Sequence, residues 1–413
     1  MMDTSRTHWP SILLTTVFAM GVLLLLVSAI ATGMISIAGL FDELADPAGS
    51  MIQSFASGFE VIVLLICGWF VLQKTLQKET ADLSLAFPFS AWQLLVIPAI
   101  FFFSISLGAA VALSEIKWLG WLILPALTLL AVVLPILLFL GVGTNGIKFG
   151  PRWRTWSALG LSMTVAPLLM ISLEIIVVML FVIAGIIFLS TQPQLTQELS
   201  KIGGLLNQGV SDEAALELLA PYFAKPAAIT SLFLFLSLIV PLIEELFKPL
   251  AVWLLATRVK SPASGFALGI LSGGAFALVE SLSVSGDGSA AWFVIVGVRT
   301  GTSLLHMTTT GLMGFAIVQL FHEKKWARFI VTYLTAAALH GIWNACAVIT
   351  VMAILGQYVG KPEWLLAIPG AFCGFAILAV GMFAVLIAAN RNVRSLLPPL
   401  PAPARGLNEE GVK

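Results

Sequence analysis

Five charged side chains lie within long apolar runs in the second half of the chain. They are Glu244, Glu245, Lys248, Glu280 and Arg299. A charged residue in the middle of a membrane-spanning helix costs about 2.5–3.5 kcal/mol on insertion scales, so five would cost about 12–18 kcal/mol without pairing. Leucine would serve a purely structural position equally well. The set therefore predicts a functional site.

Other polar side chains follow these charges at helical spacing. His306 comes seven residues after Arg299, and Asn344 comes four residues after His340, so each pair shares one face of a helix. At about 1.5 Å per residue, both histidines and the acidic residues lie near the middle of their helices. Consecutive helices joined by short loops are usually neighbours. We therefore expect the polar stripes of four helices to meet.

The chemistry that suits this inventory is hydrolysis of an amide by an activated water. A glutamate beside a second carboxylate is suited to take a proton from water. Histidine and asparagine N–H groups one turn apart, as in His340 and Asn344, can donate to a developing oxyanion.

A metal-dependent version would use the same residues. Glu280, His306 and His340 supply three ligands, and a water as the fourth would complete a catalytic zinc site. No apolar run contains the spacing His-Glu-x-x-His. On these ligand grounds the sequence favours a site without a cofactor, with zinc as the alternative.

The composition indicates where such a site would lie. Of 413 residues, 59% are hydrophobic and 10% are charged, and the mean hydropathy is +1.03. A soluble domain is typically about 45–50% apolar and about 25% charged, so this chain is an integral membrane protein. Its fold class is all-α, a polytopic bundle. Apolar runs long enough to span a bilayer are predicted at 11–38, 54–73, 92–114, 118–142, 160–190, 229–255, 265–285, 291–320, 329–353 and 364–389.

The distribution of positive charge predicts the orientation of these ten spans. With both chain ends inside, only Lys117, Lys201, Lys225 and Lys361 of the 21 Lys and Arg residues fall in outside loops, and two more lie within spans. The rest are inside, as the positive-inside rule requires. We expect an N-in, C-in topology with 191–228 as the one sizeable outside loop. In that loop Ser211 is a predicted helix N-cap.

Several features need no functional explanation or stay open. Net charge is zero, so a nucleic-acid partner has no electrostatic support. The three cysteines lie in apolar runs, which argues against disulfides.

Glu60 lies near the end of its span, within reach of the interface. Glu174 lies deeper, and the sequence leaves open whether it makes a structural hydrogen bond or belongs to the site. Pro167 in the long fifth run predicts a kink or an interfacial first turn.

The ordered motifs resemble those of the PrsW family of intramembrane peptidases, a branch of the superfamily of CAAX-prenyl endopeptidases and bacteriocin-processing enzymes. The motifs are Glu244-Glu245-x-x-Lys248, Phe276-x-x-x-Glu280, Arg299 leading to His306, and His340-x-x-x-Asn344. They cover roughly 229–353. The resemblance implies a catalytic core of four helices there. Outside this core, the apolar runs predict an N-terminal membrane region of five spans and an outside loop over 1–228, and a last span with an extended, Pro-rich tail over 354–413.

The resemblance also implies roles. Glu244 is the general base, with Glu245 as its orienting partner and Lys248 as its counter-ion. Glu280 holds the water with Glu244. His340 and Asn344 polarise the scissile carbonyl, and His306 is a third polarising group or a proton donor. Arg299 balances charge.

The expected function is cleavage of a membrane-protein substrate, in bacterial relatives an anti-sigma factor, at the bacterial cytoplasmic membrane. The bilayer itself is the other expected partner. Two rival functions use the same residues: an ion-coupled transporter, whose proton relay is also built from buried Glu, His, Lys and Arg, and a catalytically inactive scaffold of the same superfamily. Transporters often show two related halves, whereas the polar residues here gather in one half.

Overall fold

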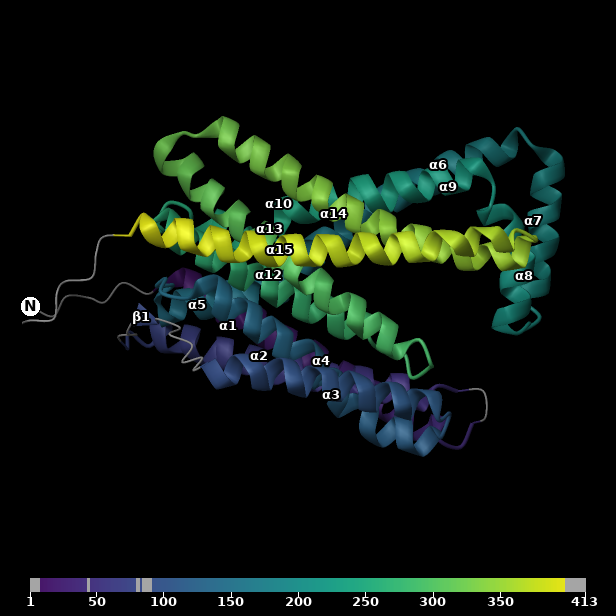
Figure 1. The fold of residues 1–413 in the computed structure, drawn as a ribbon, viewed down its shortest axis with the longest axis horizontal. Coiled ribbons are helices and arrows are strands. Elements are labelled where there is room, and N and C mark those ends of the chain that lie inside the picture. Colours follow the sequence, from purple (N-terminus) through teal and green to yellow (C-terminus); the bar gives the residue numbers. More distant parts are fainter. Residues whose placement is uncertain (1–7, 43–44, 79–81, 84–90, 398–413) are drawn as a thin grey trace, which may run out of the picture.

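The computed structural model describes residues 8–42, 45–78, 82–83 and 91–397. This part of the chain is almost wholly helical, and its one sheet pairs two short antiparallel strands, β1 (Asp82–Leu83) and β2 (Gly150–Pro151). Figure 1 shows long helices running side by side, with α7 and α8 set across one end. The helices are α1 (Trp9–Gly39), α2 (Pro47–Thr75), α3 (Ala91–Leu113), α4 (Lys117–Thr144), α5 (Arg152–Met163), α6 (Val165–Ser190), α7 (Pro193–Leu206), α8 (Asp212–Phe223), α9 (Pro226–Leu234), α10 (Val240–Phe247), α11 (Leu250–Leu255), α12 (Pro262–Val284), α13 (Trp292–Glu323), α14 (Trp326–Leu355) and α15 (Ile368–Ser395).

Ten candidate membrane spans confirm the predicted number and the all-α class. Four of them join more than one helical element: α5 with α6, α9 through α11, α14 with the 3₁₀ turn Gly356–Val359 after it, and α15 with the 3₁₀ turn Pro362–Ala367 before it. The orientation of the bundle remains a prediction. The predicted extended tail over 398–413 lies outside the described residues.

Local sequence explains two details of the connections. The fifth span breaks at Thr164 (φ −119°), because Pro167 has no N–H to donate to the carbonyl of Met163 four residues earlier. This is the predicted kink. In the segment between spans five and six, α8 begins where the Ser211 hydroxyl accepts a hydrogen bond from the backbone N–H of Ala214 at 3.3 Å, which confirms Ser211 as the N-cap.

The antiparallel pair α12 and α13 forms the centre of the bundle. Their apolar windows are 78% and 83% buried. On one side they pack against α4 and α5, and on the other α13 packs against α14 and α15. Gly265, Gly269 and Gly273 line the contact, and a Cβ on any of them would come closer than 3.0 Å to a backbone oxygen of α13. Small residues at this helical spacing let the backbones of α12 and α13 approach closely.

We predict that Gly269→Ala destabilises the protein by about 1–3 kcal/mol or more, because the added methyl group would collide with the backbone of Thr310. Thermal unfolding of the purified protein in detergent measures the effect. The matched control is Gly297→Ala on α13, where a Cβ meets nothing within 4 Å and better helix propensity should leave stability equal or slightly higher. Equal melting temperatures for both variants would contradict the close packing.

Candidate metal centre

The sixth span is an interrupted helix that carries three of the candidate residues. Between α9 and α10 lies a π-helical turn, Phe235–Ile239, and Pro249 separates α10 from α11. Pro241 and Pro249 lack the N–H groups that a regular helix would use, so some carbonyls in this span lose their usual partners. Such π turns are common at functional sites.

Side chains supply hydrogen bonds to carbonyls around these interruptions. Asn344 Nδ2 donates to the carbonyl of Leu236 at 2.8 Å, and the Tyr333 hydroxyl donates to that of Leu242 at 2.7 Å. Trp253 Nε1 donates to the carbonyl of Leu246 at 2.9 Å. Asn344 and Tyr333 both lie on α14. This helix therefore holds the irregular backbone of the sixth span in place.

Lys248 is fully buried among acceptors. Its Nζ lies 2.9 Å from Glu244 Oε2 and 2.9 Å from Glu245 Oε1. It also lies 2.8 Å from His306 Nδ1 and 4.9 Å from the centre of the Phe276 ring. Both pairings that the sequence allows for Lys248 therefore form at once, and the ammonium charge is compensated where no water reaches it.

The two histidines have one nitrogen each held by a carboxylate. His306 Nδ1 accepts from the Lys248 ammonium, so Nε2 carries the proton and donates to Glu280 Oε2 at 2.8 Å. His340 Nδ1 lies 3.0 Å from Glu245 Oε1, closer than the 3.4 Å to Lys248, which assigns the proton to Nδ1. The lone pair of His306 Nδ1 is thus taken up by the Lys248 ammonium, and that of His340 lies on Nε2.

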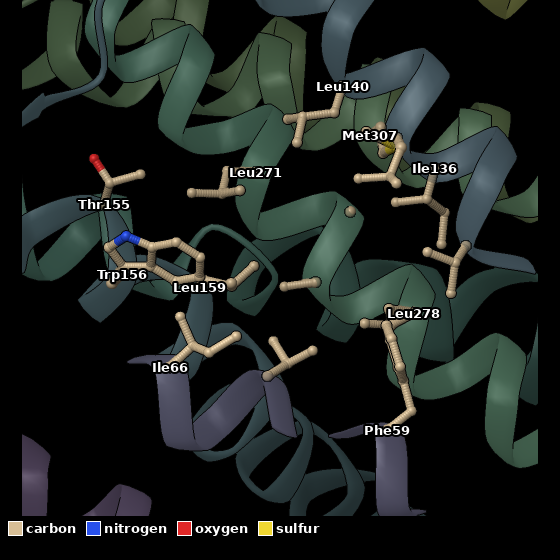
Figure 2. Close-up of a pocket in the computed structure, with 15 residues that line it drawn as sticks. Phe59, Ile66, Ile136, Leu140, Thr155, Trp156, Leu159, Leu271, Leu278 and Met307 are labelled. Carbon is tan, nitrogen blue, oxygen red and sulfur yellow. The ribbon is translucent and has the colours of Figure 1, made fainter. Parts of the chain in front are cut away.

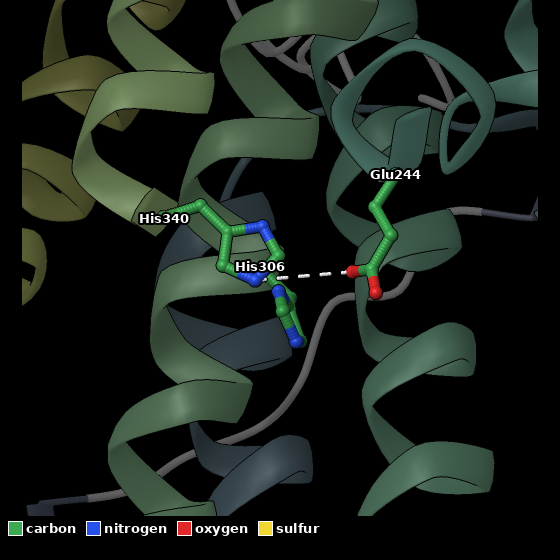
Figure 3. A group of neighbouring side chains, drawn as sticks. All are labelled: Glu244, His306 and His340. Carbon is green, nitrogen blue, oxygen red and sulfur yellow. Dashed lines mark ion pairs between the residues drawn. The ribbon is translucent and has the colours of Figure 1, made fainter. Parts of the chain in front are cut away.

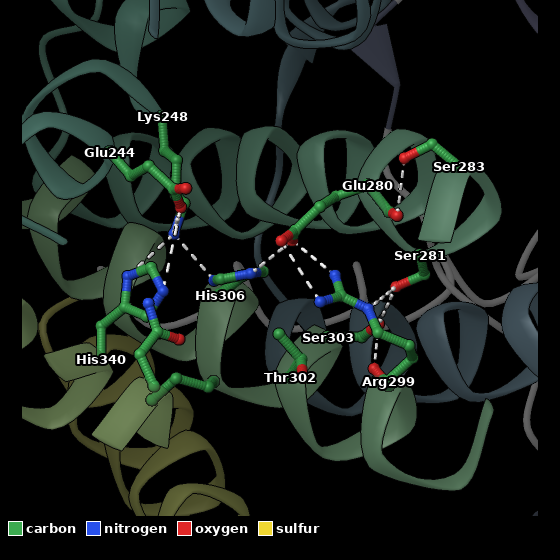
Figure 4. A network of polar contacts seen from close by, with 12 residues as sticks. Glu244, Lys248, Glu280, Ser281, Ser283, Arg299, Thr302, Ser303, His306 and His340 are labelled. Carbon is green, nitrogen blue, oxygen red and sulfur yellow. Dashed lines mark hydrogen bonds and ion pairs between the residues drawn. The ribbon is translucent and has the colours of Figure 1, made fainter. Parts of the chain in front are cut away.

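Glu280 is itself fixed by Arg299. Nη1 of Arg299 donates to Glu280 Oε1 at 3.2 Å, and Nη2 forms an ion pair with Oε2. Arg299 Nε donates to the hydroxyl of Ser281, which lies 3.3 Å from that of Ser303 (Figure 4). Glu280 thus points into the bundle, as expected, but it is occupied by two donors rather than turned toward Glu244.

Glu244, His306 and His340 form a group that can hold a metal ion. All three residues are buried, and one ligand atom of each lies within 4.8 Å of the others (Figure 3). They come from three helices, α10, α13 and α14. Two histidines and one glutamate are a ligand set of catalytic zinc, and a carboxylate behind each histidine is the usual support for such ligands.

Two further observations agree with a cation at this point. Glu244 Oε2 is buried and accepts no hydrogen bond of good geometry, although Lys248 Nζ lies 2.9 Å away. The ammonium of Lys248 contacts Glu244 Oε2 and His306 Nδ1, so a metal held by these side chains would replace it as their cationic partner. The residues present therefore fit a divalent metal.

The acidic side chains Glu280 and Glu244 form the most exposed part of the candidate site. The side chain of Glu280 is 29% exposed and that of Glu244 10%, whereas those of Glu245, Lys248 and His306 are fully buried. Glu280 and Glu244 are therefore the members of this group that a water or a substrate carbonyl can reach.

The structure brings together seven of the eight predicted site residues. Asn344 is the exception, since its amide N–H bonds to the backbone of the sixth span. Sequence analysis missed Tyr333 and Ser281 as supporting residues; Ser281 directly follows Glu280, but no pattern marked it. Glu174, which the sequence left open, has a buried Oε1 without a hydrogen-bond partner among the described residues.

A sequence model described as PrsW family intramembrane metalloprotease matches residues 151–389, more than half of the chain. The chain belongs to this family. Comparison with curated proteins and with solved structures gives no match. The matched stretch is wider than 229–353, where the motifs lie, and the division into regions at these positions remains a prediction. The resemblance noted from the motifs is confirmed, and the protein is a multi-pass integral membrane protein.

The prediction of a PrsW site without a cofactor is wrong. The family is one of metalloproteases, and the buried group of Glu244, His306 and His340 suggests a metal such as zinc. The absence of His-Glu-x-x-His was misleading because that spacing places two ligands on one helix, whereas here each ligand comes from a different helix. Glu244 stands where Glu280 was expected as the third ligand.

We predict that Glu280→Gln lowers the zinc affinity of the purified full chain about 10–100-fold. The neutral amide holds the His306 N–H more weakly and leaves Arg299 without its carboxylate. Titration against a fluorescent zinc chelator measures the affinity. Glu323→Gln at the exposed end of α13 is the control, and equal affinities for the two variants would rule out the support given to His306.

Proposed function

We propose that this PrsW family member hydrolyses a peptide bond of a membrane-protein substrate inside the bilayer, with a metal that Glu244, His306 and His340 would hold. The convergence of these three buried side chains from three helices carries the proposal. An anti-sigma factor is the substrate that the resemblance implies. A metal bound there would lower the pKa of a bound water and polarise a substrate carbonyl.

The second sphere of the site fixes the ligands. Glu245 holds the Nδ1–H of His340, and Glu280 holds the Nε2–H of His306. Each carboxylate keeps its imidazole in the tautomer that presents a lone pair to the centre. Arg299 in turn fixes Glu280 through two guanidinium nitrogens. None of these groups needs to move when the substrate arrives, which is the condition for preorganised catalysis.

Proton transfer falls to Glu244 in this proposal. Its carboxylate can use one oxygen as a ligand and the other to take the proton of the attacking water and pass it to the leaving amine. Glu244 also lies on the accessible side of the group, unlike the fully buried Glu245. Lys248 stabilises both carboxylates as anions. Asn344 is a positioning residue, because it holds the backbone turn from which α10 begins.

The rival functions have less support. An inactive scaffold gains nothing from two histidines held in ligand tautomers. A proton-coupled transporter would be favoured by polar groups spread along a path through the bundle. Here the polar contacts gather into one network between α10, α12, α13 and α14 (Figure 4).

We predict that Glu244→Gln reduces cleavage of a co-expressed membrane-protein substrate by about 10²–10⁴-fold, because both a ligand and the proton acceptor are lost. Immunoblotting of substrate fragments and metal analysis of the purified variant give the two readouts. The matched control is Glu60→Gln, which also removes a buried carboxylate from a membrane span, in α2. Full cleavage by Glu244→Gln would remove the assigned role.

We predict that stripping the metal with EDTA and ortho-phenanthroline abolishes cleavage in proteoliposomes, and that zinc restores it. The meta isomer of phenanthroline, which does not chelate, should have no effect. Undiminished cleavage by protein shown by elemental analysis to be free of metal would overturn the metal-dependent mechanism.

A further inference from the structure

A second feature of the bundle lies behind the metal centre, on the other face of α12. It is a partly enclosed cavity of about 260 Å³ between α2, α4, α5 and α12. Its walls are almost wholly apolar, and Figure 2 shows Thr155 and Trp156 together at one end, with Phe59 and Leu278 toward the other. A smaller apolar cavity of about 150 Å³ in a soluble protein stays dry and takes apolar guests.

The Trp156 end of the cavity holds a buried hydrogen-bond donor, the indole N–H. Trp156 Nε1 has no acceptor among the residues that the structure describes, whereas the neighbouring Thr155 hydroxyl donates to the carbonyl of Pro151. A buried indole N–H usually has a partner, and leaving it without one costs free energy. An occupant of the cavity that carries an acceptor at this end would satisfy the donor.

One side of the cavity opens at the outer surface of the bundle. Of its lining residues, Ile66 of α2 and Leu137 of α4 are 39% and 37% exposed. Both helices are candidate spans, so the surroundings at this depth are lipid chains rather than water. Water would need polar partners that these walls do not offer, but an acyl chain needs none.

A positive charge lies just beyond the Trp156 end. The Trp156 ring stacks on Phe70 of α2 at 5.2 Å. One turn further along α2, Lys74 Nζ lies 6.0 Å from the ring of Trp153. Lys74 is half-buried and pairs with no carboxylate among the described residues. Burial, together with the charges of Lys74 and Arg258, lowers the pKa of the nearby His8, which lies outside the spans.

We propose that the cavity binds one acyl chain of an anionic glycerophospholipid from the surrounding bilayer, with the Trp156 indole N–H donating to an ester carbonyl and Lys74 facing the phosphate. Along the site, the apolar cavity comes first, the indole N–H of Trp156 second and the Lys74 ammonium third. The acyl chain, the ester and the phosphate of such a lipid follow one another in the same order. The site lies at a helix end, where lipid esters and headgroups are found and where each Lys attracts anionic lipid. It is independent of the proposed proteolysis.

Photo-crosslinking of the full chain in phosphatidylcholine nanodiscs tests the proposal. The probe is phosphatidylglycerol with a diazirine on one acyl chain, and the control probe is phosphatidylcholine with the same chain. Peptide mapping should place the phosphatidylglycerol label on cavity residues such as Leu271 and Ile136. Label spread evenly over the outer helix faces, or equal cavity labelling by both probes, would overturn the proposal.

Three variants separate the parts of the site, each scored by cavity labelling and by thermal unfolding. Val63→Phe fills the cavity and should abolish the label, whereas Val27→Phe on the exposed face of α1 should not. Trp156→Phe keeps the stacked ring but removes the N–H, and should lower labelling about fivefold. If Val63→Phe does not fold, Trp156→Phe decides alone, and unchanged labelling contradicts the proposal.

The third variant addresses the charge. Lys74→Gln should reduce the preference for phosphatidylglycerol over phosphatidylcholine about fivefold. Lys78→Gln, at an exposed position three residues after the end of α2, is the control and should keep the preference. Loss of preference in both variants would indicate general attraction to the membrane surface instead of a site.

Discussion

The buried ammonium of Lys248 is the interaction on which the arrangement of this bundle depends. A charge without water costs several kcal/mol unless it is closely paired, and Lys248 meets this condition with acceptors from two helices. If α10 and α13 separated at this depth, the ammonium would lose His306 and the carboxylates would lose their shared geometry. The pairing therefore sets the distance between the helices that supply the candidate ligands.

The irregular backbone of the sixth span is the second constraint. A regular helix would run through the sixth span without interruption. The π turn before α10 and the break at Pro249 instead isolate a short helix. Tyr333 and Asn344 donate hydrogen bonds to carbonyls in this short helix and in the turn before it. Non-helical backbone is tolerated within a membrane only where protein groups satisfy it, so α14 is needed for the sixth span to exist in this form.

The features that could be predicted from the sequence are those that depend on spacing within one helix. Apolar runs define the ten spans, and the stripe from Gly265 to Gly273 defines the closest helix pair. Contacts between helices could not be predicted in detail. Nothing in the spacing indicates that Glu280 bonds to Arg299 and His306, or that Asn344 bonds to a freed carbonyl.

The metal was misjudged for the same reason. A ligand set spread over α10, α13 and α14 leaves no short motif, so the search for His-Glu-x-x-His could not find it. The apolar cavity is equally invisible in the sequence, because its walls come from separate spans whose residues each look like ordinary core positions. In a membrane bundle the hydrophobic pattern indicates where the spans lie. It does not indicate whether the side chains between two spans pack closely or leave a cavity.

Charge balance links the metal centre to a helix outside the four that carry the motifs. Three glutamates against Lys248 and Arg299 leave a formal charge of −1, which a divalent cation would turn to +1. Glu174 of α6 lies close enough to interact electrostatically with Glu244, Lys248 and Glu280. Its Oε1 is buried and has no hydrogen-bond partner among the described residues, and a low-dielectric interior favours the neutral form of such a carboxyl. Glu174 therefore adds no charge to this balance, and the three glutamates that contact Lys248 or Arg299 are the acids that would offset a divalent cation.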